Sequence, residues 1–571
     1  MPGAADEGRR AGRGGLLIAG AKVYFMAVGL VQQIALKHLL GLSAYGALGR
    51  VQGLASIVYN PVITTSVQGV SRAVSSAADE ERVAVQRRVL RLHAALAVPL
   101  AVGFAVAAPQ IAALAGAPHL TTPLRIVSLV LLFYGLYTPL VGVLNGRRRF
   151  GAQAGLDVCA ATLRTVGLLG GGYLGTHRWG DLGVSGALAG FACAAALMVG
   201  IALPLMRRAR ADAEGPSSPP SAETTDDAHR DGTSDEAAPT ATAPMKAVPT
   251  STAPTATFST EAAPTASAST VVIGASTVSV SRAHLRFLAP LFGGQLALNL
   301  LFQSDLQLLG RFAADAALRE GSAATAADTL AGAYRNAQLF CFLPYQLLLS
   351  VTFVLFPLLA TAHRDRDRAA VARYVQTGVR LALILAGAMV SVTAGLSRPL
   401  LVLVFGADSA DLGAPAMPIM AVGLGAFALF GILVTVLTSL GRERMSAALT
   451  VAALGLVAGL CAGLLRGQAF GPDLLLRTAL ATGIGLVLAT LGAALAVRRV
   501  AGAVAPPATL VRVVLAVTLA ASLGHALPAA ARLVTPVYAI VVAAVYATLL
   551  TLTRELGCDD ARRVAAILRR S

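Results

Sequence analysis

Apolar stretches of about 20 to 30 residues recur along this chain of 571 residues, with short polar gaps between them. A helix needs roughly 20 apolar residues to cross the hydrocarbon core of a bilayer. Helices are favoured for such spans because they satisfy all their backbone hydrogen bonds internally. The pattern predicts an all-α polytopic membrane protein with about fourteen transmembrane helices. The predicted spans are 14–36, 44–67, 90–109, 122–144, 153–175, 182–206, 286–310, 329–361, 372–396, 413–440, 444–465, 473–497, 508–527 and 533–553.

Arginine residues divide the gaps between these spans into two alternating sets. One set holds clusters: Arg72, Arg82, Arg87, Arg88 and Arg91; Arg147, Arg148 and Arg149; Arg207, Arg208 and Arg210; Arg364, Arg366, Arg368 and Arg373; Arg442 and Arg444; Arg498 and Arg499; Arg562, Arg563, Arg569 and Arg570. The other set holds mostly one basic residue per gap. Because Lys and Arg concentrate in cytoplasmic loops, both termini are predicted to be cytoplasmic. The arginine-rich, alanine-rich composition favours a multi-pass protein of a bacterial inner (plasma) membrane.

The segment 207–285 separates six predicted spans from eight. It is rich in Pro, Thr, Ala, Ser and acidic residues, a composition that predicts a disordered cytoplasmic linker, either bare or regulatory. The gaps after the second and eighth spans resemble each other (SAADEERVAVQRRVLRL and AHRDRDRAAVARYVQTGVRL). Those after the fourth and tenth spans do so as well (VLNGRRRFGAQAG and VLTSLGRERMSAA). This shift of six spans predicts two six-helix lobes in the same orientation, an arrangement found in transporters. The predicted parts are an N-terminal lobe (1–206), the linker (207–285), a C-terminal lobe (286–500), and two further helices with a cytoplasmic tail (501–571).

Composition narrows the function classes. Hydrophobic residues make up 56% of the chain and charged residues only 13%, well below the share in soluble domains. The net charge of +17 lies at the helix ends, without a basic patch and interleaved aromatics, which argues against nucleic-acid binding. The five cysteines lack metal-site spacing, so no metal or other cofactor is expected. No catalytic constellation and no long outward loop occur, so an enzyme of the polymerase or ligase type is disfavoured.

Four stretches carry a family resemblance. They are LLG followed by Tyr45–Gly46, GVSRAVS (69–75), NGRRRFG (145–151) and SLGRERM (439–445). The chain resembles polysaccharide flippases of the multidrug/oligosaccharidyl-lipid/polysaccharide exporter superfamily over roughly 14–206 and 286–500. This resemblance implies a flippase that carries undecaprenyl-diphosphate-linked oligosaccharide repeat units to the outer leaflet by alternating access, for surface polysaccharide biosynthesis. The implied partners are the bilayer, this glycan lipid, a coupling H⁺ or Na⁺, and polysaccharide assembly proteins. Lipid II flippases and cation-coupled drug antiporters are relatives and remain alternatives.

Ionisable residues inside predicted spans are candidates for substrate contact, because burying a charge in a membrane is costly. Lys22, Arg50 and Arg164 are the candidates for the diphosphate. Alternatively, Lys22 and Arg50 serve as interfacial residues whose long side chains reach the membrane surface, and Arg164 binds a neighbouring helix. Asp157 and Asp305 are candidates for coupling to an ion gradient, or for pairing with neighbouring helices.

Amide side chains are the candidates for the glycan. Gln33 follows Lys22 on nearly the same helix face, and Gln295, Asn299, Gln303 and Gln307 recur every four residues within one span. A stripe of this spacing stays on one broad side of a helix. We therefore predict that Gln33, Gln295, Asn299 and Gln303 contact sugars. The alternative is hydrogen bonding between helices.

Overall fold

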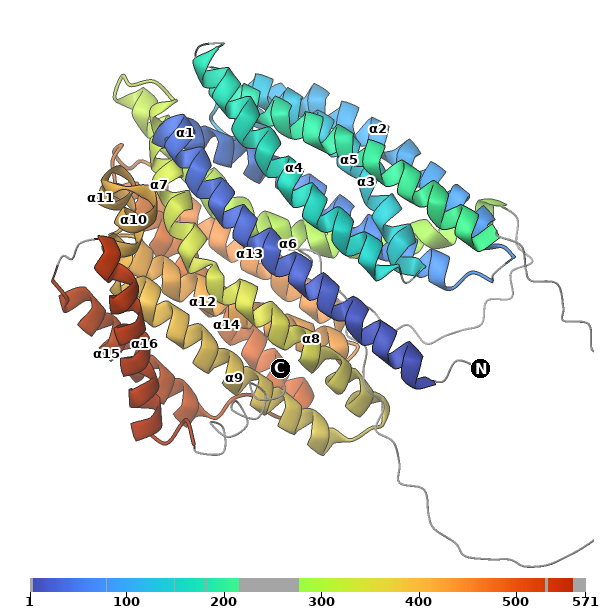
Figure 1. The fold of residues 1–571 in the computed structure, drawn as a ribbon. Helices are drawn as coiled ribbons and strands as arrows, with labels where there is room; N and C mark the ends of the chain where they lie inside the picture. The colour runs from blue at the N-terminus through green and yellow to red at the C-terminus, as the bar shows by residue number, and fades with distance from the viewer. Residues whose placement is uncertain are drawn as a thin grey trace, which may run out of the picture.

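The computed structural model describes residues 4–78, 80–147, 149–178, 180, 182–214, 277–528 and 532–557, and no strand occurs among them. The α-helices are α1 (Ala4–Ser75), α2 (Arg82–Leu114), α3 (Thr121–Gly146), α4 (Phe150–His177), α5 (Gly183–Glu214), α6 (Thr277–Arg319), α7 (Ala326–Cys341), α8 (Leu343–Arg364), α9 (Arg368–Gly395), α10 (Ser397–Phe405), α11 (Ala407–Gly413), α12 (Met417–Ser439), α13 (Glu443–Leu465), α14 (Asp473–Ala501), α15 (Pro507–Ala526) and α16 (Thr535–Leu552) (Figure 1). Two 3₁₀ turns, η1 (Pro118–Leu120) and η2 (Arg532–Val534), precede α3 and α16.

The all-helical membrane fold is confirmed. Every predicted span overlaps helical residues, and eleven of the described helices are long and apolar enough to cross a membrane. The protein is therefore a multi-pass membrane protein, whereas the count of fourteen crossings stays a prediction. Most of the predicted linker, residues 215–276, lies outside the described part of the chain.

The first two predicted spans form one helix with a sharp break instead of two helices joined by a loop. The break is at Gly41, where φ is +77° and ψ is +168°. Glycine takes this conformation at no steric cost because it has no Cβ. The chain therefore turns within a single residue.

The eighth predicted span is divided between α7 and α8. The helix is interrupted at Phe342, and Pro344 is the second residue of α8. Proline lacks an N–H, and its ring clashes with the carbonyl four residues earlier, so it is tolerated at the start of a helix and kinks or breaks one in the middle. The interruption at Phe342 places Pro344 in the first turn of α8, where its missing N–H needs no partner.

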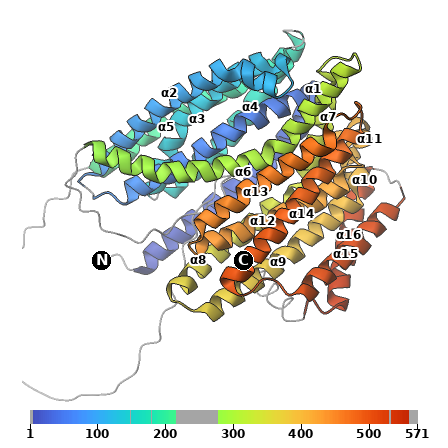
Figure 2. The same cartoon turned by 180° about the vertical axis from the view of Figure 1, so that it is seen from behind.

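Two bundles make up the molecule (Figure 1). Helices α1 to α5 pack together as the N-bundle, and α7 to α16 as the C-bundle, while α6 packs against both α1 and α13 (Figure 2). The buried apolar residues follow the same division. One cluster extends from Leu301 to Leu550, and the others lie between Leu36 and Met206.

The two ends of the bundles are named here by residues of α1. The Gly41 end also contains the end of α2, the end of α6, and α10 with α11. The Ser75 end contains the start of α2, the start of α6, and the end of α8. Most helices run from one of these ends to the other (Figure 1).

A carboxylate beyond the end of α16 ties the last two helices to α9. Glu555 is 3% exposed. Its Oε1 accepts hydrogen bonds from Arg380 Nε and Thr509 Oγ1, each at 2.8 Å, and its Oε2 accepts from Arg512 Nη1 at 2.9 Å. Burial raises the pKa of the Glu555 carboxyl, but these hydrogen bonds and the Arg380 charge outweigh it, so the pKa lies below its ordinary value.

Replacing Glu555 with glutamine should loosen this attachment. Hydrogen bonds to a charged group contribute more than neutral ones, so we expect Glu555→Gln to lower the free energy of unfolding by about 1–3 kcal/mol. Thermal unfolding in detergent at pH 7 measures the loss. Asp365→Asn is the control, because Asp365 is exposed and lies 3.9 Å from Arg364. No change is expected there.

The same effect should depend on pH. Because the folded pKa of Glu555 is lowered, its stabilisation is present above the unfolded value of about 4.3 and is lost as the pH falls through the folded pKa. We expect the difference in unfolding temperature between wild type and Glu555→Gln to be constant near neutral pH and to shrink below about pH 4. A difference that grows on acidification would contradict this assignment.

Candidate functional site

A stripe of glycines on α1 lets the C-bundle approach the N-bundle closely. A methyl group at Gly46 would overlap the Asp328 carbonyl, and one at Gly49 would strike the Arg335 side chain. A methyl group at Gly53 would meet the side-chain amides of α6. Small residues allow this kind of backbone approach between membrane helices. This contact between α1 and α6–α7 is called the seam below.

A buried ion pair crosses the seam near the Gly41 end. Arg50 of α1 is 0% exposed, and its Nη1 donates to Asp328 Oδ1 of α7 at 2.7 Å. Its Nη2 donates to the Ala115 carbonyl at 2.6 Å. The second Asp328 oxygen lies 2.7 Å from His119 Nε2 of η1. Asp328 also lies in the first turn of α7, where the helix dipole favours a negative charge.

Lys37 makes a second ionic contact between the two bundles, outside the seam. It is 7% exposed, and its Nζ donates to Asp408 Oδ1 at 2.7 Å and to the Phe405 carbonyl. The short helices α10 and α11 supply both acceptors. Nearby, Arg311 Nη1 of α6 donates to the Leu114 carbonyl at 2.7 Å. The Gly41 end is therefore joined by charged hydrogen bonds between the two bundles.

The amide stripe of α6 lies against α1. Asn299 Oδ1 accepts from Asn60 Nδ2 at 2.8 Å, and Gln307 Nε2 donates to the Arg50 carbonyl at 3.1 Å. Gln303 packs on Gly53. The first member of the stripe, Gln295, is buried, and Asn299 Nδ2 donates to its carbonyl at 2.8 Å. Most of the stripe thus lies along the seam, in contact with the N-bundle.

Arg164 lies inside the N-bundle, in a polar and aromatic setting. Its Nε donates to Gln32 Oε1 at 3.2 Å, and its guanidinium carbon is 5.3 Å from the Phe25 ring and 5.9 Å from the Phe191 ring. Within the described residues, its two Nη atoms donate no hydrogen bond. Asp157, two turns away on α4, does not pair with it. The half-buried Arg164 therefore keeps donors available.

Two other predicted residues are placed less directly. Gln33 Oε1 accepts from Tyr45 Oη at 2.9 Å, across the Gly41 break. Lys22 belongs to α1, but its side chain lies outside the part that the structure describes.

Asp305 is a buried carboxylate on the side of α6 that faces α7. It is 3% exposed, and its oxygens accept from Tyr334 Oη at 2.9 Å, from Gln338 Nε2 at 3.2 Å and from the Leu306 N–H at 2.7 Å. Among the described residues, no basic side chain pairs with it. Its side-chain partners come from α7, so the contact with a neighbouring helix that the sequence left open is made here by uncharged groups.

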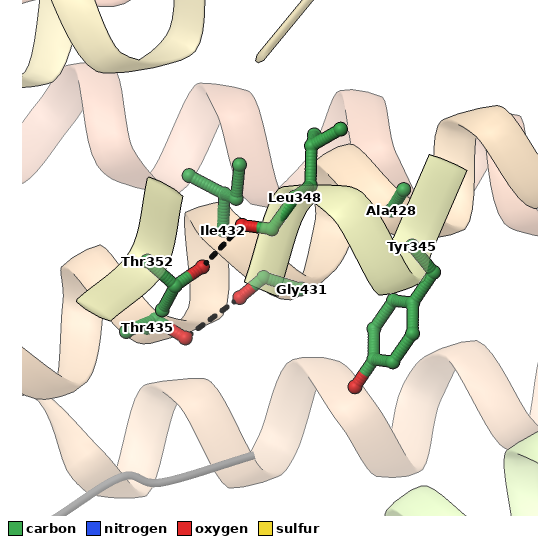
Figure 3. A pocket seen from close by; sticks show the side chains of 7 residues that line it. All are labelled: Tyr345, Leu348, Thr352, Ala428, Gly431, Ile432 and Thr435. Carbon is green, nitrogen blue, oxygen red and sulfur yellow. Dashed lines mark hydrogen bonds between the residues drawn. The ribbon is translucent and has the colours of Figure 1, made fainter. Parts of the chain in front are cut away.

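A small cavity lies between α8 and α12 (Figure 3). Its volume is about 10 Å³, which is room for about one water molecule. Thr352 Oγ1 and Thr435 Oγ1 both donate to carbonyls of their own helices. No group of three metal-ligating side chains occurs in the described ranges of the chain.

Arg50 and Arg164 were predicted from the sequence as candidate site residues, but the residues that contact them were not. Asp328 and His119 stand outside the apolar cores of the spans, and Lys37 was assigned to a loop. Gln32 sits beside the predicted Gln33 and is the amide that contacts Arg164. The signal available was Arg50 itself, because a buried charge requires a counter-charge from another helix.

Removing one member of the buried pair should be costly. Asp328→Ala leaves Arg50 buried without its counter-charge, and we expect a loss of about 3–5 kcal/mol in the free energy of unfolding. The control Asp411→Ala removes an exposed pair with Arg398 (2.6 Å) and should cost about 0–1 kcal/mol. Replacing both partners, Arg50→Met with Asp328→Leu, should restore most of the loss. Equal thermal unfolding of the two single variants would contradict this.

Part of the chain matches a known protein family. Residues 35–198 match the model of a family described as "Polysaccharide biosynthesis protein". A search of curated protein sequences gives no match. The resemblance to the multidrug/oligosaccharidyl-lipid/polysaccharide exporter superfamily, abbreviated MOP, implies a fold, and the following structures share that fold.

Three solved structures illustrate the likeness. An inward closed structure of the lipid II flippase MurJ has a TM-score of 0.66 and 14% identity, covering 95% of this chain and 99% of that one. An inward-facing MATE-family multidrug resistance transporter of the MOP superfamily has a TM-score of 0.59 and 13% identity, covering 86% and 98%. A variant of the Vibrio cholerae MATE transporter VcmN has a TM-score of 0.52 and 14% identity, covering 86% and 96%. The chain thus has the fold of MOP-superfamily transporters, and its residues 35–198 match a polysaccharide-biosynthesis family.

Proposed function

We propose that this protein is a flippase that moves polyprenyl-diphosphate-linked oligosaccharides from the cytoplasmic to the outer leaflet for surface polysaccharide assembly. One observation carries the proposal. A match to a polysaccharide-biosynthesis family over 35–198 occurs in a chain whose whole fold resembles a flippase of a lipid-linked precursor. The solved relatives are a flippase and transporters, so we assign no catalytic residues. Assembly proteins of the same polysaccharide are the expected partners.

The arginine clusters supply the orientation. The clusters that fall within the described residues lie at the Ser75 end, so this end and both termini are cytoplasmic in the proposal, and the Gly41 end faces outward. The two bundles are joined by charged contacts at the outward end. The described state is then one in which the outward side is closed.

Alternating access follows from breaking the seam. When the bundles rock apart at the Gly41 end, Arg50 separates from Asp328, and Lys37 from Asp408. Arg50 then becomes free to neutralise the diphosphate on the outward side. In the closed state that task falls to Arg164 and Lys22, since Arg164 keeps two donor groups unused among the described residues. Arginine is well suited because its planar donors match phosphate oxygens.

Glycan contacts are assigned to amides near the seam. Gln295, Asn299 and Gln303 belong to the amide stripe of α6, in which Asn299 bonds to Asn60 of α1 and Gln303 packs on Gly53, and Gln33 lies on the N-bundle. Opening the seam would exchange the hydrogen bond between Asn299 and Asn60 for bonds to sugar hydroxyls. Such an exchange keeps the polar groups satisfied in both states, as burial requires.

Ion coupling is assigned to Asp305, with Asp157 as the second candidate. Asp305 is buried and has no basic partner among the described residues, which favours its taking up a proton or a cation. Tyr334 and Gln338 already hold Asp305 in place by donating to it. Binding an ion at this point would change the charge of the interior by one unit.

Two alternatives have support of their own. The likeness to MurJ favours lipid II as cargo, and the likeness to MATE transporters favours drug efflux coupled to a cation. A drug antiporter would select cationic substrates, which the exposed donors of Arg164 disfavour. Lipid II shares the polyprenyl-diphosphate group, so only the attached glycan distinguishes it from our proposal.

The first test is transbilayer movement. Proteoliposomes with a fluorescent prenyl-diphosphate oligosaccharide should show movement with wild type, reduced roughly tenfold or more by Arg164→Ala, because a charge-assisted phosphate contact is lost. Arg178→Ala at the exposed end of the same helix should leave the rate unchanged. Movement of lipid II alone would favour the first alternative. Efflux of a cationic dye, with neither lipid moved, would contradict the proposal.

The second test addresses coupling. In the same vesicles, an imposed proton or sodium gradient should accelerate movement by wild type, and Asp305→Asn should remove that acceleration while leaving gradient-independent movement. Asp315→Asn, an exposed position on the same helix, is the control. Persistence of the acceleration in Asp305→Asn would exclude Asp305 as the coupling group and direct attention to Asp157.

A further inference from the structure

Aromatic rings from three helices of the N-bundle meet at one place. Tyr59 of α1 and Tyr134 of α3 are stacked, with ring centres 6.2 Å apart and planes 18° apart. Tyr134 also meets Tyr137 edge-on at 6.2 Å and Phe191 of α5 edge-on at 5.8 Å. Tyr59, Tyr134 and Tyr137 are called the tyrosine group below. Tyrosine offers an apolar ring face and a polar tip, a combination suited to amphipathic ligands.

The hydroxyls of this group lack protein partners in the part of the chain that the structure describes. Tyr137 is 5% exposed, and its Oη is buried without a hydrogen bond. Tyr59 Oη and Tyr134 Oη make none among the described residues either, although both side chains are only half-buried. An unpaired buried hydroxyl costs free energy, so native structures provide a partner. Tyr137 Oη is such a hydroxyl, and the hydroxyls of the half-buried Tyr59 and Tyr134 lie on adjacent rings. Together they indicate a ligand that brings its own polar groups.

Charges of both signs flank the group. The Arg164 guanidinium lies over the Phe191 ring at 5.9 Å, and that ring is the one that meets Tyr134. Asp157, from the same helix as Arg164, interacts electrostatically with the hydroxyls of Tyr134 and Tyr137. A cation and a carboxylate therefore both lie near the tyrosine group. This arrangement fits a ligand with an anionic part next to a hydroxyl-rich part.

We propose that the tyrosine group binds the sugar that adjoins the diphosphate of the lipid-linked substrate. The inference rests on the proposed function and assigns the sugar-reading residues within it. The Tyr59 and Tyr134 rings take the apolar C–H face of the sugar, since a π face is negative and C–H bonds are weakly positive. Tyr137 and Asp157 hydrogen-bond its hydroxyls, and Arg164 binds the phosphate beside it.

Binding measurements with two lipids separate this role from that of Arg164. One probe is a short-chain prenyl diphosphate carrying a sugar, and the other is the same prenyl diphosphate without sugar. We expect Tyr59→Ala and Tyr134→Ala to weaken binding of the sugar-bearing lipid about tenfold and to leave the sugar-free lipid unchanged. Arg164→Ala should weaken both. The protein is the full chain in detergent or nanodiscs.

Two controls guard against loss of folding. Tyr59→Phe and Tyr134→Phe keep the rings and should retain the stacking contribution. Tyr173→Ala removes an exposed tyrosine of α4 that stacks on His177, and it should change neither affinity. Unchanged affinity for the sugar-free lipid in the alanine variants also shows that they are folded.

The outcomes distinguish the inference from the function on which it rests. If the alanine variants weaken the binding of both lipids equally, or of neither, the tyrosine group does not bind the sugar. If wild type binds the two lipids with the same affinity, the sugar makes no contact and the inference is overturned while the flippase remains. Wild type that binds neither lipid overturns the proposed function and the sugar site together.

Discussion

The arrangement of the two bundles depends on one constraint: the buried charge of Arg50 must be neutralised by an opposite charge. Arg50 is wholly enclosed, and its nearest counter-charge belongs to the other bundle. A charge in a low-dielectric interior is stable only with a paired and hydrogen-bonded partner. The pair therefore fixes how far α1 and α7 stand from each other at the Gly41 end. The carbonyl of Ala115 and the ring of His119 complete the same set of contacts.

The glycine stripe makes this pairing of charges possible. A side chain at Gly46 or Gly49 would hold α7 away from α1 and lengthen the distance between the paired charges. The two features therefore act together. The small residues let α1 and α7 approach closely, and the ion pair holds them in this position. At the Ser75 end the contacts are of a different kind. There Arg72 lies over the Phe287 ring at 4.4 Å, and Gly69 packs on Leu288.

Most of the helices could be predicted because each one is encoded locally, by its own apolar run. The break before α8 also has a local signal, since Pro344 is favoured in the first turn of a helix. The course of α1 was mistaken because hydropathy does not report φ, and a glycine in a polar gap predicts a loop as well as a sharp turn. Pairings were the hardest part. Asp328 is separated from Arg50 by 278 residues, and no periodicity within either helix indicates the other. The tyrosine group was missed for the same reason, because its rings come from different helices.

The ion pairs between the two bundles also have a consequence for how the proposed opening would respond to voltage. An electric field acts on net charge, at roughly 2.3 kcal/mol for one elementary charge moved through 100 mV. Arg50 with Asp328 is neutral as a pair, and so is Lys37 with Asp408. When two opposite charges at the same depth separate sideways, little net charge crosses the field. In the proposed transport cycle the opening of the seam is then nearly electroneutral. The membrane potential acts chiefly on Arg164 and Asp305, which have no ionic partner among the described residues, and on the phosphates of the proposed cargo.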